Sequence, residues 1–356
     1  MDANELTREG RPPLRLQGIL GLGLMSLALY LSGVLVWLTP LPIFYAYKNG
    51  RGLKSLSGVL LPAILLVSVY GILMPMSVDR FGAEQSMKFF FWLPGMGLGS
   101  ESTWEPAIFG IVYFLFFAML GALLGEMEPE SYSVTRLIGE AVGVLALSLF
   151  LWVFFYSWGH WGEFVRGIES YFIKMLQELT KVPPANEEMQ TQWSLLKDHA
   201  SGIAYFAARL LPGMILNLMI FLLWLNIVVA RRLFGGVDKV FSSLGPLKAW
   251  RLPFLGVWIV IGFAFLAIFD AYVLKIEWLK LAAMNAFIVF TLVYFFQGLA
   301  IVAFYLNRWK LSPMIRLALY SVLILFFQPL SFLLVAFGFF DSWFDFRKLA
   351  VIPRNI

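Results

Sequence analysis

The chain has 356 residues, of which 60% are hydrophobic and 17% aromatic, and its mean hydropathy is +0.79. Only 14% of the residues are charged, well below the roughly 25% of soluble domains. These values exclude an ordinary soluble protein and predict a multi-pass membrane protein. The formal net charge of +5 does not indicate nucleic-acid binding, because the basic residues gather in short loops between apolar runs, where they set membrane orientation.

Residue types needed for common reaction centres are scarce in the sequence. It contains no cysteine and two histidines, His160 and His199, so a disulfide, a cysteine nucleophile or an ordinary zinc site is not expected. The sequence also lacks a phosphate-binding loop, an HExxH helix and a nucleophile elbow. We therefore expect no cofactor, no enzymatic activity and no ATP hydrolysis by this chain.

The N-terminal third holds three apolar stretches of unequal length. The run 17–47 is too long for one upright span and too short for two. We expect a kinked or tilted helix that is not a cleaved signal peptide. Breaks at Ser32-Gly33 or at Thr39-Pro40-Leu41-Pro42 are the alternatives. A helix should follow over about 56–75, and the short stretch 87–99 should be re-entrant or interfacial.

Two helices are predicted over about 106–126 and 137–158. Gly121 and Gly125 lie four residues apart in the first, and Gly139 and Gly143 lie four apart in the second. Glycines at this spacing form a flat groove that lets helix backbones approach closely. Because the two pairs flank one short turn, we expect them to pack against each other.

Residues 159–203 interrupt the hydrophobic pattern. Apolar residues recur at helical spacing from Phe164 to Leu179, while Glu163, Arg166, Glu169 and other charges fill the opposite face, as in an amphipathic helix. Val182-Pro183-Pro184 should end this helix, and a polar helix should follow over 187–200. The insertion either lies on the membrane surface or caps the helical bundle.

The remaining apolar runs predict helices over about 204–230, 252–273, 281–306 and 313–340. The last run is a single crossing or breaks near Pro329. The sequence therefore predicts an all-α fold, a polytopic transmembrane helix bundle of about 8 spans (8–9). We expect one transmembrane domain, 1–356, with 159–203 as an extracytoplasmic amphipathic helical insertion.

Loop charges predict the orientation of the chain. The 231–251 loop carries five basic residues against one acid, which is typical of a cytoplasmic loop. One helix separates it from 159–203, so that insertion should lie outside. The loops 48–54 and 307–310 then lie inside, in agreement with their own basic residues.

Polar residues inside the apolar runs are the candidates for function, because polar groups at membrane depth are costly. We expect Arg209, Asp270 and Asn285 to converge near the outer leaflet, with an Arg209–Asp270 ion pair, and Gln297 to lie about 18 Å below Asn285. These four residues are the candidate substrate-binding set. The competing interpretation is that they only join helices. Arg136 and Glu140 are i, i+4 and should pair locally.

Four segments carry a resemblance to a known family: TPLPIFYAYKNG at 39–50, LKAWRLPFLGVW at 247–258, FFQGLAIVAFYL at 295–306 and GFFDSWFDFRK at 338–348. With the order of apolar runs, they resemble the YybS-like family of bacterial membrane proteins, domain of unknown function 2232. The resemblance implies a bacterial cytoplasmic (inner) membrane location. It also implies a distant likeness to the substrate-binding subunits of energy-coupling-factor vitamin transporters.

Two functions follow as hypotheses, and a third, an intramembrane enzyme, ranks behind them because no acid–base or nucleophile pair lies at a useful spacing. The chain is a small-molecule binding or transport subunit with its site among the helices after residue 204, or it is a non-enzymatic scaffold that regulates a partner complex. The scaffold would contact a protein partner through 231–251 or 159–203. A water-accessible cavity between the last four helices would favour the first hypothesis. The lipid bilayer is the expected partner in both, and nucleic acid in neither.

Overall fold

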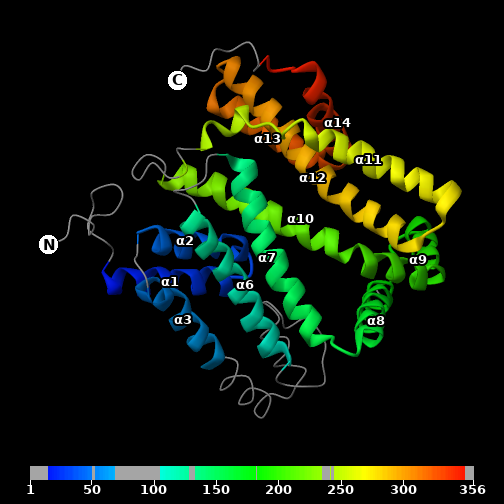
Figure 1. The fold of residues 1–356 in the computed structure, drawn as a ribbon, viewed down its shortest axis with the longest axis horizontal. Coiled ribbons are helices and arrows are strands. Elements are labelled where there is room, and N and C mark those ends of the chain that lie inside the picture. Colours follow the sequence, from blue (N-terminus) through cyan, green and yellow to red (C-terminus); the bar gives the residue numbers. More distant parts are fainter. Residues whose placement is uncertain are drawn as a thin grey trace. The chain divides into compact units, whose positions relative to one another are not determined.

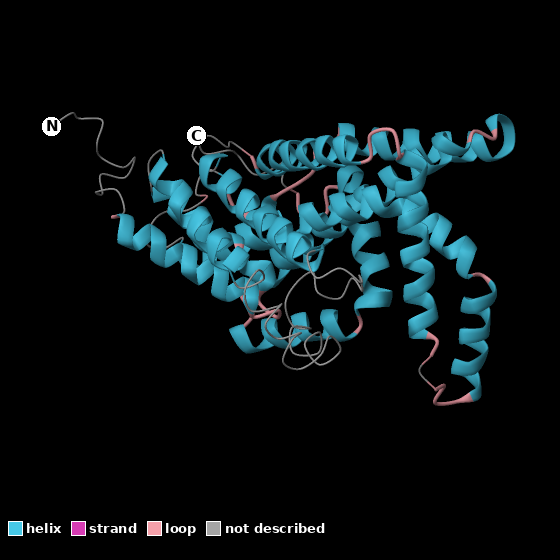
Figure 2. Cartoon of the chain, turned by 90° about the horizontal axis from the view of Figure 1, so that it is seen from below, coloured by secondary structure: helices cyan, strands magenta, loops and turns pink. Residues whose placement is uncertain are grey.

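A computed structural model describes residues 15–49, 53–68, 105–127, 133–181, 183–234, 241 and 244–348. Every regular element among these residues is a helix (Figure 2), so the all-α prediction is confirmed. Among them, six helices are long and apolar enough to cross a membrane: Gly110–Met127, Val134–Tyr156, Ala200–Phe234, Leu255–Leu274, Glu277–Arg308 and Phe327–Phe344. The predicted re-entrant stretch 87–99 and the end of the 56–75 helix lie outside the described residues.

The chain divides into two compact units. One comprises Met1–Leu145 with Ile220–Gly245, and the other comprises Ala146–Met219 with Pro246–Ile356. The first unit contains α1 (Leu16–Leu31), η2 (Val36–Leu38), α2 (Pro40–Asn49), α3 (Leu53–Ser68), α6 (Glu105–Met127) and the start of α7 (Val134–Tyr156). It also contains the C-terminal part of α10 (Ala200–Phe234).

The first apolar run is two short helices, so the expectation of one kinked helix is wrong. The chain leaves α1 at Ser32, and Gly33 takes a positive φ of +67°, which glycine adopts at little cost. The proline-containing segment then starts α2 (Figure 1), where proline at the first helical position loses no helical hydrogen bond. The Ser26 hydroxyl donates to the Thr39 carbonyl at 2.7 Å and ties the turn to α1.

Glycines set the closest helix contacts of this unit. A Cβ on Gly121 would clash with the Pro40 carbonyl, and one on Gly125 would lie 2.6 Å from the Tyr47 Cβ. The groove that Gly121 and Gly125 form on α6 therefore packs against α2. No atom of the described residues lies within 4 Å of a Cβ added to Gly139 or Gly143. The predicted packing of the two glycine pairs on each other is therefore wrong.

The second unit holds the candidate site. Its elements are the end of α7, α8 (Trp161–Leu179), α9 (Glu187–Asp198), the N-terminal part of α10, η7 (Leu247–Ala249), α11 (Leu255–Phe269), η8 (Asp270–Leu274), α12 (Glu277–Arg308), α13 (Pro313–Leu325) and α14 (Phe327–Phe344). The helices α12 and α14 lie side by side (Figure 1). A Cβ on Gly338 would clash with the Tyr294 carbonyl, and one on Gly298 with the Leu334 carbonyl, so these glycines let the two backbones touch.

The last apolar run breaks, as one of the two alternatives predicted. The helix α13 ends at Leu325, and α14 starts at Phe327. Pro329 is the third residue of α14, inside the first turn where proline is tolerated. At 13 residues, α13 is shorter than a bilayer span. The six candidate spans of the described residues include α14 for this run. The two predicted spans without a counterpart among them are 17–47, which forms the short helices α1 and α2, and 56–75, of which the described part is the short helix α3.

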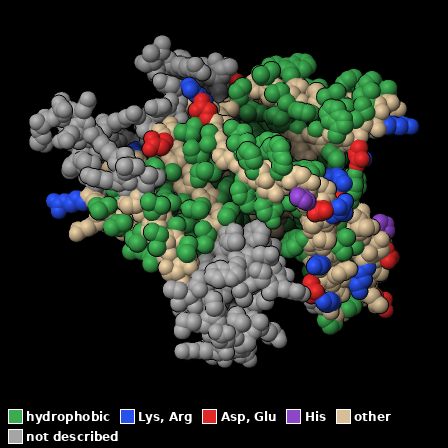
Figure 3. All heavy atoms as spheres, turned by 60° about the horizontal axis from the view of Figure 1, so that its bottom comes forward, with side chains coloured by type: hydrophobic (Ala, Val, Ile, Leu, Met, Phe, Trp, Pro, Cys, Tyr) green, Lys and Arg blue, Asp and Glu red, His purple; other side chains and the backbone are tan. Residues whose placement is uncertain are grey.

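The amphipathic insertion forms the two helices that the sequence predicted. Its first helix, α8, presents apolar residues on one face, and its second, α9, is capped by Asn186, whose side chain accepts from the Met189 nitrogen at 2.8 Å. Charged side chains and both histidines gather over these helices in Figure 3, where green apolar side chains cover most of the other coloured surface. The charged surface over α8 and α9 is that of a polar segment, distinct from the apolar helices of the second unit.

Candidate functional site

A pocket of about 370 Å³ opens between the N-terminal part of α10, η8 and the start of α12. It combines an aromatic side with charged side chains of both signs. The lining residues are Tyr205, Phe206, Asp270, Lys275, Glu277, Lys280 and Leu281. The volume falls at the lower end of the range of small-molecule sites, roughly 300–1,000 Å³.

Asp270 shapes the turn that carries much of this lining. The α-helix α11 widens at this residue into the π-turn η8, and Lys275 ends the turn in the left-handed region with φ +54°. The Asp270 carboxylate accepts from the Ile276 nitrogen at 2.6 Å. Asp270 is 2% exposed, so a buried acid both closes the turn and faces the pocket. π-turns of this kind are frequent at functional sites.

Arg209 lies behind the aromatic side of the pocket. Its guanidinium carbon lies 3.3 Å from the centre of the Tyr205 ring, a cation–π arrangement. Its ion pair is with Glu169 of α8. The predicted Arg209–Asp270 ion pair is therefore wrong. The amphipathic helix, which the sequence predicted either on the membrane surface or as a cap of the bundle, supplies the partner. Asp270 accepts a hydrogen bond in its own turn instead.

Asn285 joins α10 to α12. Its Oδ1 accepts from the Gly213 nitrogen at 2.6 Å, and its Nδ2 donates to the carbonyls of Arg209 at 3.0 Å and Leu281 at 2.9 Å. All three bonds use backbone groups. The oxygen and the nitrogen of the side-chain amide are thus both used in hydrogen bonds to helix backbones. This agrees with the competing interpretation from the sequence, in which the residue only joins helices.

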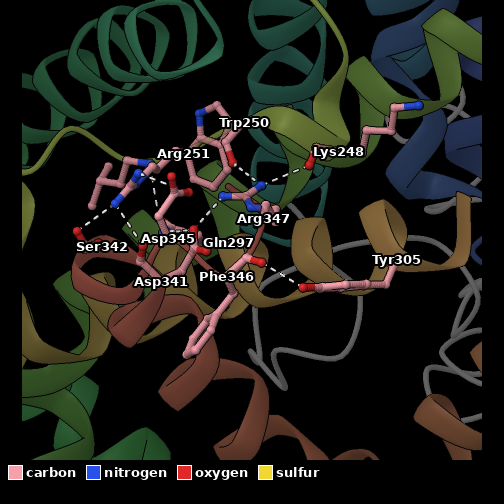
Figure 4. Close-up of polar contacts among 11 residues, drawn as sticks. Lys248, Trp250, Arg251, Gln297, Tyr305, Asp341, Ser342, Asp345, Phe346 and Arg347 are labelled. Atoms are coloured by element: carbon pink, nitrogen blue, oxygen red, sulfur yellow. Dashed lines mark hydrogen bonds and ion pairs between the residues drawn. The ribbon is translucent and has the colours of Figure 1, made fainter. Parts of the chain in front are cut away.

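Gln297 belongs to a second polar cluster at the other end of α12 (Figure 4). Its Oε1 accepts from the Leu252 nitrogen at 3.0 Å, and its Nε2 lies 3.3 Å from Asp341 Oδ2. Asp341 Oδ2 also lies 2.7 Å from Arg347 Nη2, and both of these side chains are fully buried. We name Gln297, Asp341 and Arg347 the inner cluster.

Backbone carbonyls complete the inner cluster (Figure 4). Arg347 Nη1 donates to the carbonyls of Lys248 and Trp250, both at 2.9 Å. Arg251 donates to the carbonyls of Asp341 and Ser342 at 2.8 and 2.6 Å. The segment 248–252 and the end of α14 are thereby held against α12. This arrangement fixes the fold of the second unit, because each cation has protein partners on several sides.

The structure therefore distributes the four predicted site residues over two places, with three of them in or next to the pocket. Asp270 lines the pocket, Arg209 supports its Tyr205 wall, and Asn285 bonds the carbonyls of Arg209 and of the lining residue Leu281. Gln297 lies apart in the inner cluster. Among the described residues, no three His, Asp or Glu side chains come close enough to hold a metal ion.

Sequence reasoning missed the lysines of the pocket and the ion pair of the inner cluster. Lys275 lies in a short loop and Lys280 in the first turn of α12, where a lysine looks like an ordinary solvated charge. Asp341 and Arg347 follow an apolar run at the end of a helix, and only folding shows that both side chains are fully buried. The sequence feature that could have indicated this ion pair is the presence of both acidic and basic residues in the apolar segment GFFDSWFDFRK at 338–348.

Comparison with known proteins gives one match. No curated protein and no solved structure matches the sequence. A family model described as "Predicted membrane protein (DUF2232)" matches residues 55–342, which include α10 to α13, nearly all of α14 and the whole pocket. The resemblance noted in the sequence is therefore confirmed, and the chain belongs to this family of predicted membrane proteins.

Proposed function

We propose that this multi-pass membrane protein binds a small polar molecule in the pocket between α10, η8 and α12, as the binding component of a transport assembly. The observation that carries the proposal is the pocket itself, with a buried carboxylate and two lysines on its walls. Binding sites for small molecules combine an aromatic or apolar surface with a few polar groups that orient the ligand. The described lining has both.

The pocket favours binding over catalysis. Its buried acid is used as a hydrogen-bond acceptor within the turn, and its two lining lysines are exposed side chains that can contact a ligand. We therefore infer a non-enzymatic role, with the energy for any transport supplied by a partner. The bacterial cytoplasmic membrane and a likeness to the binding subunits of energy-coupling-factor transporters are parts of this proposal, on the ground of the resemblance described above.

A pocket-filling variant tests the proposal without knowledge of the ligand. The wild-type protein, Leu281→Trp and Phe287→Trp would be purified from membranes and denatured, and the released molecules identified by mass spectrometry. Leu281 lines the pocket, whereas Phe287 is 54% exposed on the same helix. We expect one compound class to accompany the wild type and Phe287→Trp but not Leu281→Trp. Identical extracts from all three proteins would contradict the proposal.

A scaffold function is the second candidate, and one observation favours it. The helix α8 leaves Tyr171, Met175 and Leu179 exposed at successive helical turns, a stripe that a partner protein can cover. Replacing all three with serine would test this function. If the triple serine variant loses a co-purified protein but keeps its small-molecule content, the scaffold function is favoured. If Leu281→Trp loses the small molecule but keeps the co-purified protein, the binding function is favoured.

A further inference from the structure

The pocket carries charges of both signs in equal number. Lys275 and Lys280 face it with Asp270 and Glu277, so the formal charge of the lining is zero. A ligand with one sign of charge would leave the opposite pair of side chains without a partner, which costs affinity. The lining is matched by a ligand that carries one positive and one negative group.

These charges are available to a ligand. Among the described residues, Lys275, Glu277 and Lys280 take part in no ion pair, although they are close enough to line one pocket. The Lys280 Nζ lies 5.5 Å from the centre of the Phe206 ring, which holds the ammonium over the aromatic side. Asp270 is buried in the pocket wall, and its hydrogen bond from the Ile276 nitrogen uses Oδ1 alone.

The elements that line the pocket also expose large aromatic and apolar side chains. Tyr272 of η8 and Trp278 of α12 are 82% and 69% exposed, and aromatic side chains of this kind concentrate at the level of lipid headgroups. Exposed Val273 and Leu274 continue the apolar surface beside them. A headgroup in the pocket would thus have an apolar surface next to it for the chains of its lipid.

From these features, and resting on the proposed function, we infer that the ligand is a small zwitterion with an ammonium and an anionic oxygen group. The carboxylates of Asp270 and Glu277 bind the ammonium, and Lys275 with Lys280 binds the anionic group through charge-assisted hydrogen bonds. Two sources present this chemistry: the headgroup of an ethanolamine phospholipid and a free zwitterion such as phosphoethanolamine.

Binding to the full-length protein in an uncharged detergent tests the inference. Thermal unfolding would be followed with phosphatidylethanolamine, phosphoethanolamine, phosphatidylglycerol and inorganic phosphate as probes. We expect one or both zwitterions to raise the midpoint, with affinity lowered about tenfold in Lys280→Ala and in Glu277→Gln, since each removes one charge-assisted contact. The exposed α9 variants Lys197→Ala and Glu188→Gln serve as controls and should bind like the wild type.

Each outcome has a distinct meaning. Stabilisation by the lipid alone identifies a headgroup site, and stabilisation by phosphoethanolamine identifies a site for a free zwitterion; both support the inference. Equal stabilisation by phosphatidylglycerol or phosphate, lost in Lys280→Ala and kept in Glu277→Gln, would show an anion site. That result would overturn the inference and leave the proposed function standing. If no probe binds and the extracts described above show no compound dependent on the pocket, both fail.

Discussion

The side-chain amide of Asn285 bonds the Gly213 nitrogen at 2.6 Å and the Arg209 carbonyl at 3.0 Å. These are the donor and acceptor that an α-helix joins to each other, from residue i to i−4. Pro212 precedes Gly213 and has no N–H of its own, so α10 is weakened at this level. Asn285 supplies hydrogen bonds from a neighbouring helix where the proline disturbs the helical ladder, which is how proline is tolerated in membrane helices.

Loss of this amide should destabilise the α10–α12 contact. Asn285→Ala removes three hydrogen bonds to backbone groups, and we expect a loss of roughly 1–2 kcal/mol in the free energy of unfolding. Asn217 is the matched control, since its side chain donates one bond, to the Ile288 carbonyl at 3.1 Å. Thermal melts in detergent should rank Asn285→Ala below Asn217→Ala, and the opposite order would refute the role of the amide.

The two glycine pairs should respond differently to the same substitution. Gly121→Leu forces α6 away from the Pro40 carbonyl and should reduce the yield of folded protein. Gly143→Leu places its side chain where no atom of the described part of the chain lies within 4 Å of the added Cβ, and it should purify and melt like the wild type. Size-exclusion profiles with melting curves give the comparison. Equal damage from both variants would mean that Gly143 does pack against a helix.

The inner cluster should be sensitive to the loss of one partner and more tolerant of the loss of both. Arg347→Met leaves the buried Asp341 carboxylate without its cation, at a cost of roughly 3–5 kcal/mol. In the double variant Arg347→Met with Asp341→Leu, part of this loss should be recovered, because no buried charge remains unpaired. Chemical unfolding in detergent would measure all three proteins.

An exposed ion pair serves as the control for this experiment. Arg136 and Glu140 lie 2.6 Å apart, as their i, i+4 spacing predicted, and their side chains are 57% and 47% exposed. Arg136→Met should therefore cost less than about 1 kcal/mol. An equal cost for Arg136→Met and Arg347→Met would contradict the importance of burial.

The orientation of the chain remains a prediction with a direct test. Because the sequence has no cysteine, a single engineered cysteine is the only reactive thiol. Ser170→Cys in α8 should react with a membrane-impermeant thiol reagent in intact cells, and Ser242→Cys in the basic 231–251 loop should not. Reaction at position 242 alone would reverse the predicted topology.

Local patterns predicted the helices well. Amphipathic spacing located α8, and the apolar runs located α6, α7, α10 and α12 to within a few residues of their observed ends. The sequence predicted a break at Ser32-Gly33 as an alternative, but helix propensity alone did not decide between one kinked helix and two helices. What decided it was a tertiary contact, the packing of α2 into the α6 glycine groove.

Partners across the fold were predicted less well, for a physical reason. Depth along a helix follows from its rise per residue, so Asn285 and Arg209 were expected at one level, and the structure brings them together. The rotation of a helix about its axis does not follow from depth. Arg209 therefore faces Glu169, which the sequence placed in the insertion and not among the candidates for a pair.

The central claim is that the pocket beside Asp270 is open to water and receives a ligand. The rate of labelling of Leu281→Cys by a small hydrophilic thiol reagent tests it most directly, with Ala283→Cys as the control, since Ala283 lies on the same helix and is 2% exposed. We predict fast labelling at 281, slow labelling at 283, and slower labelling at 281 after addition of the extract released from the wild-type protein. Equal rates at the two positions, or a rate at 281 that the extract does not change, would contradict the claim.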